Sequence, residues 1–290
     1  MNKLKSPSFN YVKARTVEDA ISLLVEHGDM AVIIAGGQSL IPALNLRLSS
    51  PEVLIDIGQI KGLSDVVVQG SFVRIGALVL HAEIYRSETV AESIPLLSQA
   101  ARYVAHDAIR NRGTFGGSLS NAHPASEFPA CVVALDGVIN IQGPNGLRSV
   151  SSDDFFTGLF STALEPDEIL LSVDLAVLKN GQHFVFSEYA PRHGDYAVVG
   201  LAASATIEKG VLSSLRLVYF GVEDRPIRAL NAEVNLTGKK IDESILKFAM
   251  LQLEKELQPS SDFGASANYR LQLAKVMLKR VITEIVEKGA

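Results

Sequence analysis

Two glycine pairs, Gly36-Gly37 and Gly116-Gly117, are the residues of this chain whose type and spacing most clearly indicate chemistry. Glycine has no Cβ and accepts a positive φ, so the backbone N–H groups of such a pair can approach an anion closely. Gln38 and Ser39 follow the first pair and add side chains that can hydrogen-bond. One glycine pair alone is also typical of an ordinary strand-ending turn. Two such loops favour an extended diphosphate held from two sides, and therefore a dinucleotide.

The second glycine loop carries more polar groups than the first. It reads Arg110-Asn111-Arg112-Gly113-Thr114-Phe115-Gly116-Gly117-Ser118. Arg110 and Arg112 can pair with phosphates, brace the loop or face a partner subunit, and the sequence leaves these roles open. Neither loop has the G-x-G-x-x-G or the Walker A pattern, so the chain has no fingerprint for NAD.

The first loop follows an apolar run at residues 31–35, which predicts a buried strand. A helix is expected before it, with Thr16 as the N-cap, Asp19 three residues later and Gly28 at its end. Around the second loop, helical spacing runs from Leu97 to Ala105, and residues 110–121 read as a loop. A helix with Pro124 in its first turn is then expected at residues 124–135. Hairpins are predicted at residues 66–75 and 138–150.

The pattern changes near residue 177. Two long β-type segments, 196–208 and 212–222, are followed after Pro226 by helical spacing to the end of the chain. We therefore expect an α+β protein with a first domain at residues 1–177, itself split near residue 58, and a second at 178–290. The second domain would be a small antiparallel sheet packed on helices.

Several kinds of chemistry are excluded by composition. A single cysteine, Cys131, allows no internal disulfide and no iron–sulfur cluster built by this chain alone, and a buried apolar role for it is favoured over a redox role. The six histidines show no zinc-ligand spacing, so no metal site is expected. His81-Ala82-Glu83 lacks the cysteine pair that a zinc deaminase requires.

The overall charge and the apolar runs bear on partners and location. The net charge is −5 without a basic tract, which argues against nucleic-acid binding. No apolar run reaches the roughly 18–20 residues of a membrane span. The segment from Met1 to Pro7 has no apolar signal-peptide core, so a cytoplasmic location is expected.

Ala35-Gly36-Gly37-Gln38-Ser39-Leu40 and residues 109–117 resemble the paired flavin loops of the molybdenum hydroxylase FAD subunits. These are the medium subunits of the aerobic carbon monoxide, quinoline and nicotine dehydrogenase type, similar to the flavin domain of xanthine dehydrogenase. The resemblance continues in order through residues 121–127, 167–171 and 192–197. It implies a two-part FAD-binding domain of the PCMH, vanillyl-alcohol-oxidase-like kind, followed by the C-terminal domain of carbon monoxide dehydrogenase flavoproteins.

The resemblance implies a set of FAD contacts and no catalytic acid or base. Glu127, where Asp is usual, would hydrogen-bond the cofactor, Leu170 would contact the adenine side, and Tyr196 would cover the isoalloxazine ring and gate it. Tyr196 can equally be a core residue. The diphosphate would lie between two further groups: Ile34, Ala35, Gly36, Gly37, Gln38, Ser39 and Leu40 on one side, and Thr114, Gly116, Gly117 and Ser118 on the other.

Two features qualify this set of contacts. Glu188 stands where many relatives carry a Lys close to FAD, and Glu127 is one methylene longer than Asp. His106 and His123 lie beside the second loop, with a flavin contact, a cap or a surface role open for His123. No histidine motif indicates covalent attachment, so non-covalent FAD is expected.

The resemblance implies an electron-transfer subunit. Substrate would react at a molybdopterin in a large subunit, and electrons would cross two [2Fe-2S] clusters in a small subunit to reach this FAD. They would then leave to NAD, quinone or oxygen. A heterotrimer that dimerises is expected. Two alternatives are a self-sufficient flavoenzyme acting on a small molecule and a non-catalytic flavin-binding sensor.

Overall fold

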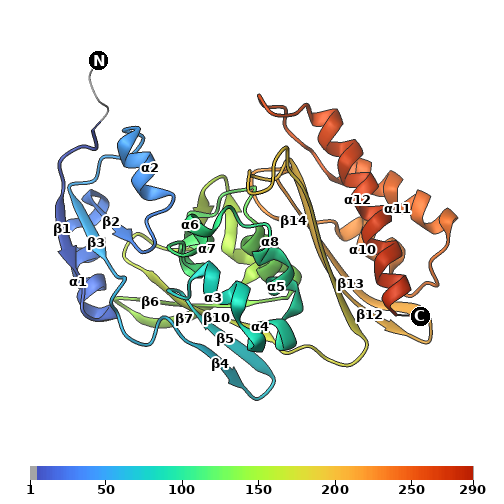
Figure 1. Cartoon of the computed structure of the whole chain (residues 1–290), viewed down its shortest axis with the longest axis horizontal. Helices are drawn as coiled ribbons and strands as arrows, with labels where there is room; N and C mark the ends of the chain where they lie inside the picture. Colours follow the sequence, from blue (N-terminus) through green and yellow to red (C-terminus); the bar gives the residue numbers. More distant parts are fainter. Residues whose placement is uncertain (1–4, 290) are drawn as a thin grey trace.

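The computed structural model describes residues 5–289, so Met1 to Leu4 of the N-terminal segment lie outside the described residues. Three layers follow one another along the molecule in the order of the sequence (Figure 1). Each layer has its own sheet, and three clusters of buried apolar side chains lie within and between the layers. The architecture is the expected α+β mixture, with an antiparallel sheet packed on helices at the C-terminal end.

The N-terminal layer is a small parallel sheet of order β1-β3-β2. Thr16 accepts a hydrogen bond from the N–H of Asp19 and caps the first helix, which ends at Gly28 as predicted. The Asp19 carboxylate accepts from the N–H of Arg15, so it does not close the capping box on Thr16. The elements are β1 (Asn10–Lys13), α1 (Val17–His27), η1 (Gly28–Met30), β2 (Ala31–Ile34), α2 (Leu40–Asn45) and β3 (Val53–Asp56).

Strand β2 differs from its prediction in burial. All four of its residues are half-buried, whereas Val53, Leu54 and Ile55 of β3 are buried. The reason is position: β2 lies at the edge of the sheet, and its residues line a cavity described below. An apolar strand can therefore be open to a ligand cavity and still read as a core strand in the sequence.

The central layer has an antiparallel sheet of order β4-β5-β10-β6-β7, covered by short helices. Both predicted hairpins, β4–β5 and β6–β7, are confirmed. Its strands are β4 (Val66–Gln69), β5 (Phe72–Gly76), β6 (Val138–Gly143), β7 (Gly146–Ser151) and β10 (Ile169–Ala176), with the small pair β8 (Phe156–Gly158) and β9 (Ser161–Thr162) beside them. Its helices are α3 (His81–Arg86), α4 (Glu88–Ser93), α5 (Pro95–Ala101), α6 (Asp107–Arg110), α7 (Phe115–Asn121), α8 (Glu127–Ala134) and α9 (Ser152–Phe155).

Three helix boundaries in this layer were predicted wrongly. The helical spacing that ends at Ala105 extends beyond α5, which ends at Ala101, and Ala105 has a φ of 39°, outside the helical region. The stretch 110–121 is mostly helix α7, since the Thr114 hydroxyl caps its first turn. Helix α8 starts at Glu127, not at Pro124, because Ser126 is extended and its N–H closes a turn onto His123.

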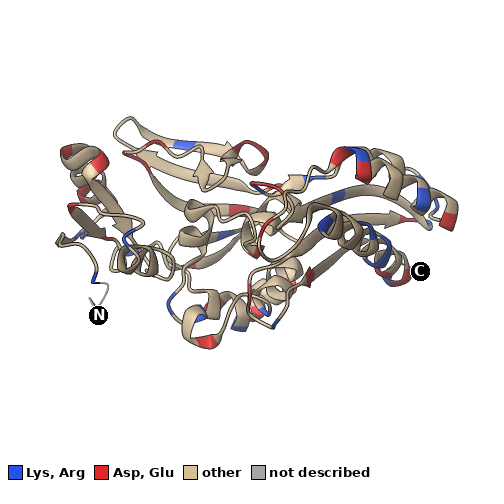
Figure 2. Ribbon diagram, turned by 90° about the horizontal axis from the view of Figure 1, so that it is seen from above, with Lys and Arg blue, Asp and Glu red and all other residues tan. Residues whose placement is uncertain are grey.

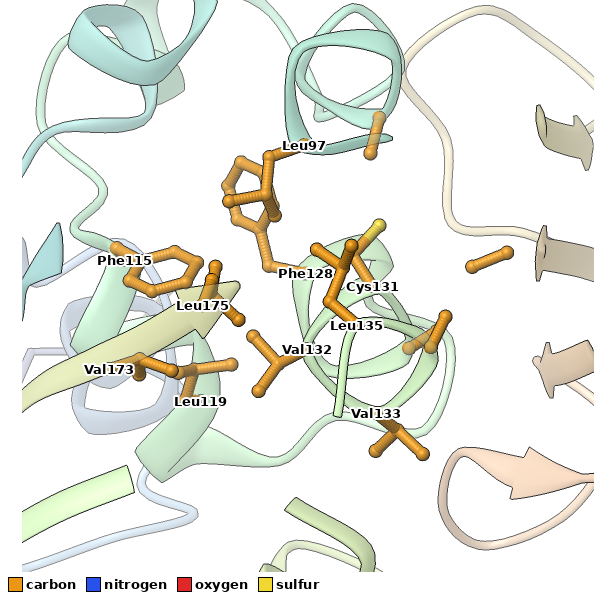
Figure 3. Close-up of a cluster of buried hydrophobic side chains, with 14 of the residues drawn as sticks. Leu97, Phe115, Leu119, Phe128, Cys131, Val132, Val133, Leu135, Val173 and Leu175 are labelled. Carbon is orange, nitrogen blue, oxygen red and sulfur yellow. The ribbon is translucent and has the colours of Figure 1, made fainter. Parts of the chain in front are cut away.

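Helix α8 forms the centre of the molecule, and all of its residues are buried. Figure 3 shows Phe128, Cys131 and Val132 of this helix among Phe115, Leu119 and Val173. Cys131 is fully buried, and burial raises the pKa of its thiol well above the usual value. This supports the apolar role expected for Cys131, because a buried protonated thiol is unreactive.

The C-terminal layer is an antiparallel sheet of order β11-β12-β13-β14 with helices packed on it. The chain after Pro226 first forms the two-residue strand β14 beside β13, which the helical prediction missed. Lys, Arg, Asp and Glu are interspersed over the last helices (Figure 2). The elements are β11 (Gln182–Tyr189), β12 (Val199–Glu208), β13 (Val211–Phe220), β14 (Ile227–Arg228), α10 (Leu230–Leu236), α11 (Glu243–Glu256) and α12 (Ala267–Lys288). Within residues 5–289, none of the helices combines the length and the apolar character needed to cross a bilayer.

Candidate functional site

A cavity of about 640 Å³ is bounded by the N-terminal and the central layers together with residues 194–196 of the C-terminal layer. This volume is in the range of cofactor and ligand sites. The structure brings every one of the fourteen candidate residues into the wall of this cavity: Ile34, Ala35, Gly36, Gly37, Gln38, Ser39, Leu40, Thr114, Gly116, Gly117, Ser118, Glu127, Leu170 and Tyr196. Their shared location is a structural finding, and their role in holding FAD remains a prediction.

Loop one, residues 35–40, connects the C-terminal end of β2 to α2. Gly37 has a φ of 72°, a conformation that glycine adopts without strain. The backbone N–H groups of Gln38, Ser39 and Leu40 have no hydrogen-bond acceptor within the described part of the chain. Loop one therefore offers free donors at the wall of the cavity.

Gly36 brings the two glycine loops into contact with each other. A Cβ on Gly36 would overlap the carbonyl oxygen of Arg112 and lie 2.9 Å from the Cα of Gly113. Such distances are too short for real contacts, so only glycine fits between the loops. The sequence suggested that this glycine makes room for an anion, whereas the structure shows that it makes room for the second loop.

Loop two, residues 113–118, contains the first turn of α7, and among the described residues all of its N–H groups except that of Thr114 donate within the chain. Phe115 and Gly116 donate to the carbonyls of Val79 and Ala77, each at 2.8 Å. Gly117 donates to the Thr114 hydroxyl at 3.2 Å. The side of loop two that bounds the cavity is therefore a packed wall, with few free donors for an anion.

The segment 77–81 holds loop two, a role that no sequence pattern indicated. Besides the two bonds to Phe115 and Gly116, the N–H of His81 donates to the carbonyl of Gly113 at 2.9 Å. The His81 Nε2 lies 2.9 Å from the Thr114 carbonyl, which only accepts, so Nε2 carries the proton. Burial lowers the pKa of His81 to about 4 and keeps the ring neutral at pH 7. His81 thus fastens the loop through its Nε2–H.

Positive charge is missing from the wall of the cavity. No Lys or Arg lies among the wall residues in the part of the chain that the structure describes. Arg110 instead donates to the carbonyls of Val104 and Ala105 at 2.7 and 2.9 Å and pairs with Asp107, so it braces the segment before loop two. Arg112 is exposed and stands outside the wall. A diphosphate in this cavity would be bound by backbone donors.

The cavity is acidic around Glu127, a wall residue, and Glu188, which interacts with Glu127, lies outside the wall. This part of the cavity is its acidic end. Glu127 in the first turn of α8 is 7% exposed, and burial raises the pKa of its carboxyl to about 7. Burial, together with the charge of Glu127, raises the pKa of Glu188 on β11 to about 8. Oε2 of Glu188 is buried and has no hydrogen-bond partner within residues 5–289. At least one proton is therefore held by this pair near neutral pH.

Tyr196 lies at the same end, on the segment between β11 and β12, and is 57% exposed, so a core role is excluded. Its ring stacks on His123. His106 lies against Gly194 and does not reach the cavity wall. Among the described residues, no group of three or more His, Cys, Asp or Glu is arranged to hold a metal ion.

Two family models match the chain. The family described as "FAD binding domain in molybdopterin dehydrogenase" matches residues 7–176. The family described as "CO dehydrogenase flavoprotein C-terminal domain" matches residues 184–285. The two matches together span most of the chain, and the gap between them, residues 177–183, runs from the end of β10 into β11.

Similar proteins align over nearly their full length. The 6-hydroxypseudooxynicotine dehydrogenase complex subunit alpha of Paenarthrobacter nicotinovorans is 37% identical over 287 residues, covering 99% of this chain and 97% of that protein. Carbon monoxide dehydrogenase from Hydrogenophaga pseudoflava superposes with a TM-score of 0.96 at 32% identity, covering 99% of this chain and 100% of that chain. Quinoline 2-oxidoreductase from Pseudomonas putida 86 gives a TM-score of 0.93 at 37% identity, with coverages of 98% and 99%.

Proposed function

The chain belongs to the FAD-binding medium subunits of the molybdenum hydroxylase family, and from this premise we propose that it relays electrons through an FAD bound between loop one and loop two. When bound, FAD accepts electrons singly and passes them on singly or in pairs. The observation that carries the proposal is the convergence of all fourteen candidate residues on one cavity.

The roles of the chain's own residues in this proposal differ along the cavity. The free N–H groups of Gln38, Ser39 and Leu40 bind the diphosphate. Loop two closes the opposite side and is held in place by the segment 77–81. Glu127 and Tyr196 face the ring system at the acidic end, and Leu170 contacts the adenine side. The FAD is held without a covalent bond.

We propose that the electrons come from other chains. The sequence has one cysteine, too few for an iron–sulfur cluster of its own. Relatives are named as subunits or medium chains of dehydrogenases, which supports an assembly with an iron–sulfur chain and a molybdopterin chain, as a dimerised heterotrimer. The external acceptor would be NAD, a quinone or oxygen, and the complex would act in the cytoplasm.

We also propose that the chain divides into domains at residue 177, with a further division near residue 58. The first division is supported by the change of sheet between Ala176, the end of β10, and Gln182, the start of β11. The second is supported by a distinct apolar cluster built mainly on α1 and β3, which also takes in Leu78 and Ile169 of the central layer.

Co-purification from the native host tests this function. Absorbance and metal content are read on the same sample, together with the number of accompanying chains. The proposal predicts flavin, iron and molybdenum in stoichiometric amounts with two further chains. Flavin on a solitary chain that turns over a small molecule would instead identify a self-sufficient flavoenzyme.

A further inference from the structure

Three aromatic rings from separate segments meet beside the acidic end of the cavity. The rings of His123 and Tyr196 are stacked, with centroids 3.9 Å apart and planes 8° from parallel. On the same histidine, Phe160 from the tip between β8 and β9 packs edge-on at 5.2 Å and 79°. His123 is therefore the middle ring of the three.

His123 is fixed by hydrogen bonds on its own segment and beyond it. Its Nδ1 accepts the N–H of Ala125 at 3.1 Å, and its carbonyl accepts the N–H of Ser126 at 2.9 Å. The neighbouring carbonyl of Pro124 accepts from Gly221 at the end of β13 at 2.8 Å. An Nδ1 that accepts leaves the second ring nitrogen as the donor, and burial lowers the pKa of His123 and favours this neutral form.

Tyr196 has no comparable anchor. Its hydroxyl makes no hydrogen bond within the described residues, and the segment around it has a single turn bond, from the N–H of Asp195 to the carbonyl of Arg192 at 3.1 Å. The next anchor is the N–H of Val198, which donates to Tyr189 at 2.8 Å. The stack on His123 is therefore the main contact that orients the Tyr196 ring.

The two rings have different relations to the cavity. Tyr196 belongs to the wall of the cavity, whereas His123 does not. Because His123 covers one face of the Tyr196 ring, only the other face and the edges of that ring can border the cavity. A parallel ring behind a wall residue fixes the plane that the wall residue presents to a ligand.

We propose that His123 is a positioning residue, which holds the Tyr196 ring in place so that its cavity side forms a stacking surface for the flat ring of the ligand. In its second half this inference rests on the proposed function, because the flat ring would be that of FAD. Its first half concerns only side chains of this chain and can be tested without any flavin.

The experiment compares two substitutions of His123, one that removes its aromatic ring and one that removes its hydrogen-bond acceptor. His123→Asn keeps an acceptor for the N–H of Ala125 and removes the aromatic ring. His123→Phe keeps the ring and removes the acceptor. Both are made in the full chain, purified with any chains that accompany it from the native host. The double variant H123N/Y196L tests whether the effect acts through Tyr196.

The first readout is amide hydrogen exchange of the peptide covering residues 192–197 in flavin-free protein. We expect exchange about three- to tenfold faster in H123N and close to wild type in H123F, with β12 unchanged in both. H123N/Y196L should exchange no faster than Y196L. Wild-type exchange in H123N, or equally fast exchange in H123F, overturns the proposal because the ring would then have no positioning role.

The second readout is the fluorescence of added FAD. If Tyr196 stacks on the flavin, H123N should increase the fluorescence of the bound cofactor, and H123F should restore the quenching. Bound FAD with identical fluorescence in all variants overturns the stacking surface. A wild-type chain that binds no FAD refutes the proposed function, while the exchange measurement still decides whether His123 positions Tyr196.

Discussion

Loop one and loop two carry similar glycine pairs, yet their backbone N–H groups have different partners. In loop one, three consecutive N–H groups, from Gln38 to Leu40, have no acceptor within the described residues. In loop two, Phe115, Gly116 and Gly117 donate to the chain itself. Glycine thus serves two ends. In loop one Gly36 lets the two loops pack against each other, and in loop two Gly116 lets α7 pack closely onto the segment 77–81.

Gly36→Ala tests the contact between the two loops and should have the largest effect. The added methyl group would overlap the Arg112 carbonyl, so one loop must move. We expect a loss of about 3 kcal/mol in the free energy of unfolding and at least about a hundredfold weaker FAD binding. Thermal unfolding and the flavin content of purified protein measure both effects.

The matched control is Gly158→Ala, because a Cβ there would only meet Asp224 at 3.6 Å and should be neutral. If G36A retained wild-type stability and flavin content, the two loops would not form one unit.

Gly116→Ala tests the packing of loop two. Its Cβ would lie 2.5 Å from the Cβ of Ala77, and we expect a loss of about 2 kcal/mol in stability. Ala77→Gly in the same chain removes that Cβ and should restore part of the loss. Urea denaturation of both single variants and the double variant measures the coupling. Additive losses would show that Gly116 acts otherwise than by close packing.

Glu188→Gln tests the acidic end of the cavity. Its effect on the free energy of unfolding should depend on pH, unlike the effects of the loop substitutions. Burial raises the pKa of Glu188 to about 8, so the folded protein binds more protons than the unfolded chain between about pH 4.5 and 8. Stability therefore falls as pH rises through this window. We expect E188Q to reduce this fall and to be more stable than wild type by about 1–2 kcal/mol at pH 8.

The control for this series is Glu208→Gln, an exposed carboxyl on the neighbouring strand β12. The measurement is the free energy of unfolding by urea at a series of pH values. If E188Q followed the wild-type curve, the carboxyl of Glu188 would not be held protonated in the fold.

Thr114→Val and Thr114→Ser test the hydrogen bond inside loop two, and we expect them to have the smallest effect of the series. Valine keeps the shape and removes the acceptor of the Gly117 N–H, whereas serine keeps the hydroxyl. We expect T114V to lose about 1 kcal/mol of stability and T114S to lose little. If T114V bound FAD more tightly than wild type, the freed N–H would be a phosphate donor and loop two would resemble loop one.

The sequence predicted the strands and turns better than it predicted the local helices. Loop one, both hairpins and the cap at Thr16 depend on short-range patterns, and these were right. The start of α8 depends on a turn that uses the His123 side chain, which no pattern around Pro124 reveals. The glycines at 36 and 116 were recognised for a ligand, but the atoms that exclude a Cβ there come from residues distant in sequence. His81 was missed as a support of loop two for the same reason.

A crystal structure of the chain with FAD tests the central difference between the two loops most directly. The account predicts diphosphate oxygens at about 3 Å from the backbone N–H groups of Gln38, Ser39 and Leu40, with the hydrogen bonds of loop two to the segment 77–81 intact. A diphosphate bound by loop two, with those bonds broken, or one placed outside this cavity, would contradict it.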